Sequence, residues 1–94
     1  MAMIDKVKVA LRISSATTAY DGEITDLISA AEADLLLSGV VAIDETDVLI
    51  IRAVTTYCKA NFGWDNPDAE RLQSSYNSIK GHLTSSADYT TEVT

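Results

Sequence analysis

The feature that most constrains this chain is a largely apolar segment over residues 44–63, whose ends carry the signals of a helix start and a helix stop. Asp44 can cap a helix, Asp47 can reach back toward that cap, and negative charge in a first turn suits the helix dipole. Gly63 supplies the left-handed residue that commonly ends a helix. The apolar residues that recur at helical spacing between these ends are Val48, Ile51, Val54, Tyr57 and Cys58. Further apolar residues widen this stripe, and a helix that is apolar nearly all round needs several neighbours, so we expect it at the centre of the fold.

Two segments before this helix have the periodicity of amphipathic helices. Apolar residues recur at helical spacing over residues 3–12, which predicts a short first helix. A second helix is expected to begin between residues 19 and 22, because Thr18 and Asp21 have the spacing of a capping box. It should end at residues 38–39, where a serine precedes a glycine.

The remaining segments predict one linker and one more helix. Residues 40–43 are apolar enough for a strand, but no second strand-like run is present to pair with them, so we expect a packed linker. Asn66 followed by Pro67 is a strong helix start, and an apolar seam then continues to Leu83. Beyond Thr84 the chain is polar, and we expect a tail that is ordered only if something holds it.

The sequence therefore predicts an all-α fold, a compact bundle of about four helices around a central apolar helix at residues 44–62. A chain of 94 residues makes one domain at the small end of what folds alone. We expect a helical domain over residues 1–84 and a polar C-terminal tail over residues 85–94.

Charge and hydropathy exclude several classes of protein. Fourteen acids against seven bases give a net charge of −7, which opposes loose binding to phosphate backbones. Only Lys6, Lys8 and Arg12 lie close together in the sequence, and we interpret them as a solvated helix face. No apolar run is long enough to span a membrane. The first residues lack the apolar core of a signal peptide, so we expect a cytoplasmic product.

No pattern of residues predicts catalysis, a metal site or a cofactor site. Cys58 lies on the apolar side of the central helix, where a small core residue is expected rather than a nucleophile. His82 is the only histidine and is expected to face solvent near the end of the last helix. One Cys and one His cannot make a zinc site. The sequence has no glycine-rich phosphate loop and no calcium-loop spacing. We therefore expect no enzyme activity.

Two interpretations of the molecule as a whole stay open at this point. Some apolar side chains exceed what a minimal four-helix core can bury: Leu36, Leu37, Val40, Val41, Ile50 and Trp64. They favour either a monomer with a few exposed apolar groups or a surface that meets another copy or a partner. A small helical interaction module or DNA-binding regulator is the alternative function, because Arg71, Gln73 and Asn77 could lie on an exposed helix face.

Taken end to end, the chain resembles the small head–tail connector proteins of tailed bacteriophages, the adaptor family often described as DNA packaging proteins. The resemblance lies in the order and spacing of four stretches: residues 6–13 (KVKVALRI), 20–31 (YDGEITDLISAA), 52–63 (RAVTTYCKANFG) and 72–83 (LQSSYNSIKGHL). Each stretch alone is mostly amphipathic helix, so the specific part is their combination within one short chain.

The resemblance implies a mostly helical subunit that forms a homo-oligomeric ring of about a dozen copies below the portal protein. Genome DNA would pass through the ring without specific recognition, and the ring would extend the channel and offer a platform to the stopper or tail-completion protein. The implied location is the head–tail junction of the virion, with host cytoplasm during assembly and no membrane. No catalytic residue or cofactor is implied.

Candidate residues for this role follow from charge and apolar character. An acidic ring lets DNA slide, whereas a basic ring would hold its phosphates. We expect the acids that could face the channel on the connection into the central helix: Asp44, Glu45 and Asp47. The candidate contacts with another subunit or a partner, which include large aromatic side chains that often anchor interfaces, are Tyr20, Leu36, Leu37, Val41, Trp64 and Tyr89.

Overall fold

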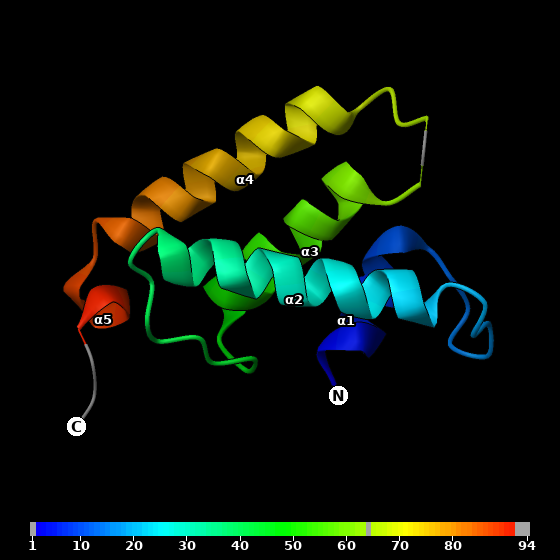
Figure 1. Cartoon of the computed structure of the whole chain (residues 1–94), viewed down its shortest axis with the longest axis horizontal. Coiled ribbons are helices and arrows are strands. Elements are labelled where there is room, and N and C mark those ends of the chain that lie inside the picture. The colour runs from blue at the N-terminus through cyan, green and yellow to red at the C-terminus, as the bar shows by residue number, and fades with distance from the viewer. Residues whose placement is uncertain (1, 64, 92–94) are drawn as a thin grey trace.

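The computed structural model describes residues 2–63 and 65–91, and every regular element within them is a helix. The helices in chain order are α1 (Met3–Leu11), α2 (Asp21–Leu37), α3 (Val48–Asn61), α4 (Ala69–Thr84) and the short α5 (Ala87–Thr90). α3 packs against α1, α2 and α4, most extensively against α4. In Figure 1, α2 crosses in front of α3 while α4 runs along the upper side of the bundle. The predicted all-α bundle around a central helix is confirmed.

One hydrophobic core joins the four longer helices and the segment after α2. Its largest fully buried side chains are Tyr76, Ile24, Leu35, Ile50, Leu83, Val7, Val40, Val54 and Cys58. Val40 is completely buried, so residues 40–43 form the packed linker that the sequence predicted. No helix in residues 2–63 and 65–91 is long and apolar enough to cross a membrane.

The central helix begins later than the sequence predicted, and one residue of its predicted stripe is exposed. Asp47, and not Asp44, caps α3, because its Oδ1 accepts hydrogen bonds from the backbone N–H groups of Leu49 at 2.8 Å and Ile50 at 3.3 Å. Val48 is 76% exposed in the first turn, whereas Ile50 is fully buried. Four of the five stripe residues face the core as predicted, since Val54 and Cys58 are buried and Ile51 and Tyr57 pack against it. Only Val48 was placed wrongly, because apolar residues on several sides of a helix leave the edge of its buried face undefined.

The ends of the other helices agree with the predicted boundaries to within a few residues. α2 begins at Asp21 without the side-chain cap that Thr18 was expected to provide. Asn66 does not cap α4 directly; its Oδ1 accepts the Asp68 N–H at 3.0 Å, and α4 starts at Ala69. Gly63 has a φ of 78°, the left-handed conformation expected after α3.

Lys8 does not belong to a solvated face. It is 5% exposed, and its Nζ lies 2.6 Å from Asp21 Oδ1 and donates to the Thr17 carbonyl at 2.8 Å. The expectation of a solvated basic cluster was therefore wrong at Lys8. This lysine instead joins α1 to the start of α2, because folding brings the acid beside it from another helix.

Candidate functional site

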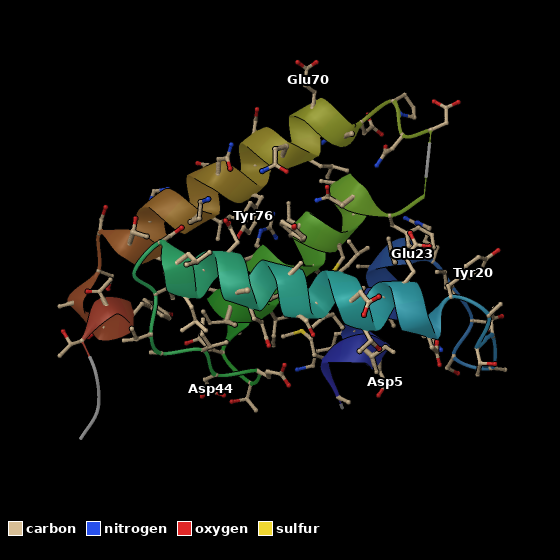
Figure 2. All side chains as sticks on the ribbon, in the orientation of Figure 1. Asp5, Tyr20, Glu23, Asp44, Glu70 and Tyr76 are labelled. Atoms are coloured by element: carbon tan, nitrogen blue, oxygen red, sulfur yellow. The ribbon has the colours of Figure 1, made fainter. Side chains whose placement is uncertain are left out.

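The predicted channel-facing acids lie on the connection between α2 and α3. Asp44 is exposed and closes a local turn, where its Oδ1 accepts from the Thr46 N–H at 2.9 Å and the Thr46 hydroxyl at 2.7 Å. These hydrogen bonds lower the pKa of the Asp44 carboxyl below its ordinary value. Figure 2 shows Asp44 at the outer edge of this connection, away from the helices. Glu45 is also exposed, whereas Asp47 is half-buried and engaged as the cap of α3.

Tyr89 of α5 makes two sets of hydrogen bonds to the connection between α2 and α3. Its carbonyl oxygen accepts the backbone N–H groups of Val41 at 2.8 Å and Ala42 at 3.2 Å. Its hydroxyl lies 3.1 Å and 3.0 Å from the two carboxylate oxygens of Asp47. Tyr89, which the sequence proposed as a partner contact, is therefore half-buried against its own chain and holds the start of α3.

The alanine variant Tyr89→Ala is expected to loosen this connection. The free energy of unfolding should fall by about 2 kcal/mol, because apolar contact and hydrogen bonds are lost together. Hydrogen exchange of the Val41 and Ala42 amides should accelerate more than exchange in the middle of α2. Both variants keep the backbone carbonyl. Tyr89→Phe is the matched control, since it keeps the ring and removes only the hydroxyl that meets Asp47, and it should cost about 1 kcal/mol. Unchanged exchange at Val41 in the alanine variant would contradict this role of α5.

Glu32 on α2 and Glu45 on the connection form a carboxyl pair that the sequence did not reveal. Burial raises the pKa of Glu32 to about 7, and the neighbouring Glu45 carboxyl adds to the rise. Within residues 2–63 and 65–91, Glu32 Oε2 is a buried oxygen without a hydrogen-bond donor. Two carboxyl groups share a hydrogen bond only when one carries a proton, so this contact is favourable only when Glu32 is protonated.

Stability should therefore rise as the pH falls from about 8 to about 5, because the folded pKa of Glu32 lies above its ordinary value of 4.5. Glu32→Gln should raise the free energy of unfolding at high pH by about 1 kcal/mol, a discounted figure because Glu32 is partly exposed. Urea unfolding across this pH range tests the prediction. Glu45→Gln is the control and should keep most of the pH dependence, since burial is the larger cause. A parallel pH profile for wild type and Glu32→Gln would contradict it.

Several apolar side chains remain exposed on α2 and α3. Leu37 is 89% exposed and Leu36 is 52% exposed at the end of α2, and Val48 and Leu49 are exposed at the start of α3. Of the other predicted contacts, Val41 is half-buried under Tyr89, and Trp64 lies outside the described residues. The structure therefore leaves Leu36 and Leu37 available to a partner.

Tyr20 is 46% exposed just before α2 and is partly covered by its own chain. Its ring meets Phe62 edge to face, with 5.6 Å between the ring centroids. Figure 2 shows Tyr20 at the end of the bundle opposite α5. It therefore does not belong to the group of exposed leucines, and those predicted contact residues that the structure describes do not form one continuous patch.

A basic groove runs between α1, α3 and α4, and the sequence analysis missed it. Four of the seven bases line two adjoining hollows there: Arg12, Arg52, Lys59 and Arg71. Arg71 lies 3.6 Å from Asp68, and both side chains are exposed. Within the part of the chain that the structure describes, Arg12, Arg52 and Lys59 make no ion pair. These bases are far apart in the sequence, so only the packing of the helices brings them together.

The remaining chemistry is structural. Cys58 is fully buried, and burial raises the pKa of its thiol to about 12, so the reactive thiolate is suppressed. His82 is exposed in the last turn of α4. Among the described residues, no three His, Cys, Asp or Glu side chains are grouped so as to hold a metal ion.

Comparison with known proteins gives one match. A family model described as "Phage connector protein" matches residues 3–90, from the first residue of α1 to the last residue of α5. No curated protein and no solved structure matches the chain.

Proposed function

The chain belongs to the phage connector protein family, and from this membership we propose that it is an adaptor subunit that forms a ring under the portal. The family is structural, and it assigns the chain a general head–tail connector role in the virion neck beside other neck proteins. In the proposed assembly the ring contains about a dozen copies, extends the DNA channel and carries the stopper or tail-completion protein.

The observation that carries this proposal is the extent of the family match. It covers all five helices, so the whole described bundle, and not one helical piece, corresponds to a connector. The exposed leucines at the end of α2 are consistent with a subunit that neighbours cover in the assembly. A ring additionally needs two different contact surfaces on each copy.

The acids of the connection between α2 and α3 are proposed to face the DNA channel. Asp44 and Glu45 are exposed, and Asp44 is held ionised by its hydrogen bonds to Thr46. Asp47 contributes less in this proposal, because its carboxylate caps α3 and accepts the Tyr89 hydroxyl. Negative charge repeated around a ring would repel phosphates and let DNA move without being held.

Deleting the gene from the phage or prophage that encodes it tests the function in its own setting. The proposal expects DNA-filled heads and free tails that do not join, with joining restored by the wild-type chain supplied from a plasmid. Electron microscopy of the lysate distinguishes these particles directly. Complete infectious virions in the absence of the chain would contradict the proposed role.

A further inference from the structure

One face of α2 is exposed along most of its length and has a simple pattern. The residues at positions i, i+4, i+7 and i+11 of this face are Asp26, Ala30, Ala33 and Leu37, and all four are exposed. Eleven residues make about three helical turns, so the four side chains lie in one line about 16 Å long. We name this line the α2 strip; it is acidic at one end, small in the middle and apolar at the other end.

The exposed face of α3 has the same spacing in the opposite chemical order. Its residues at i, i+4, i+7 and i+11 are Val48, Arg52, Thr55 and Lys59, of which only Thr55 is half-buried. We name this line the α3 strip; it is apolar at its start and basic at its end. Arg52, Thr55 and Lys59 also line the basic groove, so the charge of Arg71 and Arg12 lies beside them.

The two strips lie on different sides of the molecule. The buried residues of α3 that meet the core, Ile50, Val54 and Cys58, lie on the helix face opposite Arg52 and Lys59. α2 contributes Ile24, Ile28, Ala31 and Leu35 to that same core and packs on that face of α3. In Figure 1, α2 crosses in front of α3, so its outer face points away from the groove. Two complementary surfaces that point apart favour a chain of copies over a closed pair.

We propose that the α2 strip of one copy lies antiparallel on the α3 strip of the next copy, and that this contact builds the ring. The inference rests on the proposed function and adds the two surfaces that meet. Asp26 and Leu37 are eleven residues apart, and so are Val48 and Lys59. The two strips therefore have the same length, and in this alignment Leu37 lies on Val48 and Asp26 lies beside Lys59. Ala30 and Ala33 leave room for the longer Arg52 and Thr55 side chains.

Charge favours a second copy over other occupants of the groove. α2 carries five acids and no base, namely Asp21, Glu23, Asp26, Glu32 and Asp34. Asp21 and Asp34 are paired within the chain, whereas Asp26 is exposed on the strip and the exposed Glu23 precedes it by one turn. The groove supplies four bases on a protein whose net charge is −7. The contact therefore brings together the acidic helix and the basic surface that the same chain provides.

Charge reversal tests the pairing. Asp26→Lys and Lys59→Glu should each weaken self-association about tenfold or more, because an opposite-charge contact becomes a like-charge contact. Leu37→Ser should have an effect of about the same size, since its side chain loses an apolar partner. All three residues are exposed, and at concentrations where the wild type is monomeric circular dichroism should show unchanged helix content and thermal midpoints. The matched control for Asp26→Lys is Glu70→Lys, which makes the same change of charge on the outer side of α4. Figure 2 shows Glu70 pointing into solvent there.

Rescue separates this pairing from a general effect of charge. The chain carrying both Asp26→Lys and Lys59→Glu should assemble again, because the two substituted side chains, now of exchanged sign, meet across each contact as an opposite-charge pair. An equimolar mixture of the two single variants should assemble more strongly than either variant alone, for the same reason. Sedimentation velocity over a concentration range, with and without the purified portal protein, measures each case. Failure of both rescues would overturn the pairing.

The outcomes distinguish this inference from the function on which it rests. A wild-type chain that stays monomeric with and without portal would overturn the ring and the pairing together. A wild-type chain that assembles, with every strip variant assembling equally well, would overturn the pairing alone. Salt-sensitive binding of duplex DNA that is lost in Lys59→Glu but kept in Asp26→Lys, without an effect of either on assembly, would show that the groove holds phosphates instead.

Discussion

Replacing Tyr76 with alanine is expected to lower the free energy of unfolding by about 3–5 kcal/mol. Tyr76 is completely buried, and its ring meets Tyr57 edge to face with 5.1 Å between the ring centroids. Its hydroxyl donates to Asp34 Oδ2 at 2.6 Å, and this contact crosses from α4 to α2. A small domain has a total stability of about 5–10 kcal/mol, so this variant loses about a third or more of it. Thermal and urea unfolding measure it.

The phenylalanine variant Tyr76→Phe separates the ring from the hydroxyl. It keeps the core packing, so its cost should be about 1–2 kcal/mol, the value of a hydrogen bond to a charged group. The Tyr76 hydroxyl and the Lys80 ammonium, 3.0 Å from Asp34, lower the pKa of that carboxyl. Because the pKa of Asp34 is lower in the folded state, its ionised form stabilises the fold above the unfolded pKa, and this stabilisation is lost as the pH falls through the folded pKa. Part of the wild-type acid sensitivity below about pH 4 should therefore disappear in Tyr76→Phe. A cost for Tyr76→Ala no larger than that for Tyr76→Phe would contradict the role of the ring.

The second large effect is expected at Lys8. Lys8→Ala should lower the free energy of unfolding by about 1–2 kcal/mol, because it leaves the Asp21 carboxylate, whose side chain is 37% exposed, without its cation. The contact of Asp21 Oδ1 with Lys8 Nζ at 2.6 Å is the interaction that compensates the partial burial of this carboxylate. The Thr17 carbonyl would lose its donor at the same time.

A double-mutant cycle tests whether the ion pair or the lysine side chain matters. Replacing both partners, as in Lys8→Met with Asp21→Leu, should cost about 1 kcal/mol or less, since no unpaired charge is left behind. The single variants Lys8→Met and Asp21→Leu should each cost more than the double variant. Equal and additive costs for the two single changes would contradict a coupled pair.

The helices were predictable where one residue type decides the local conformation. Gly63 indicated the end of α3 because few other residues adopt a left-handed conformation without cost. The apolar spacing of α2 and α4 identified their buried sides, since each has one apolar stripe and one polar side. The prediction for α3 was wrong at two residues. Apolar residues on several sides of this helix made Val48 look like a core residue, and Ile50, which is buried, was counted among the surplus apolar side chains.

The surface properties depend on contacts between distant residues, and a single sequence does not show them. Lys8 resembled a surface base because its partner Asp21 belongs to another helix. The basic groove was missed because Arg12, Arg52 and Arg71 lie on different elements and meet only after folding. One signal was present in the sequence, since Val48, Arg52, Thr55 and Lys59 share helical spacing. This spacing was overlooked because the helix was interpreted as apolar on nearly all sides.

The modest size of the domain links its stability to its assembly. Binding to neighbours stabilises the folded subunit by mass action, so the strip variants should differ from wild type in apparent stability only at concentrations where the wild type assembles. Tyr76→Ala and Lys8→Ala should differ at all concentrations, because their lost contacts lie within one copy. Thermal midpoints at low and high protein concentration therefore separate the two groups of residues.

The mass of the protein in solution tests the central claim most directly. We would measure it by light scattering across a range of concentrations, with and without the purified portal protein of the same phage. The account predicts a closed species of about a dozen copies, either alone or when the portal is present. A monomer or dimer that is indifferent to portal, but whose mass shifts with duplex DNA at physiological salt, would contradict it and favour the DNA-binding alternative.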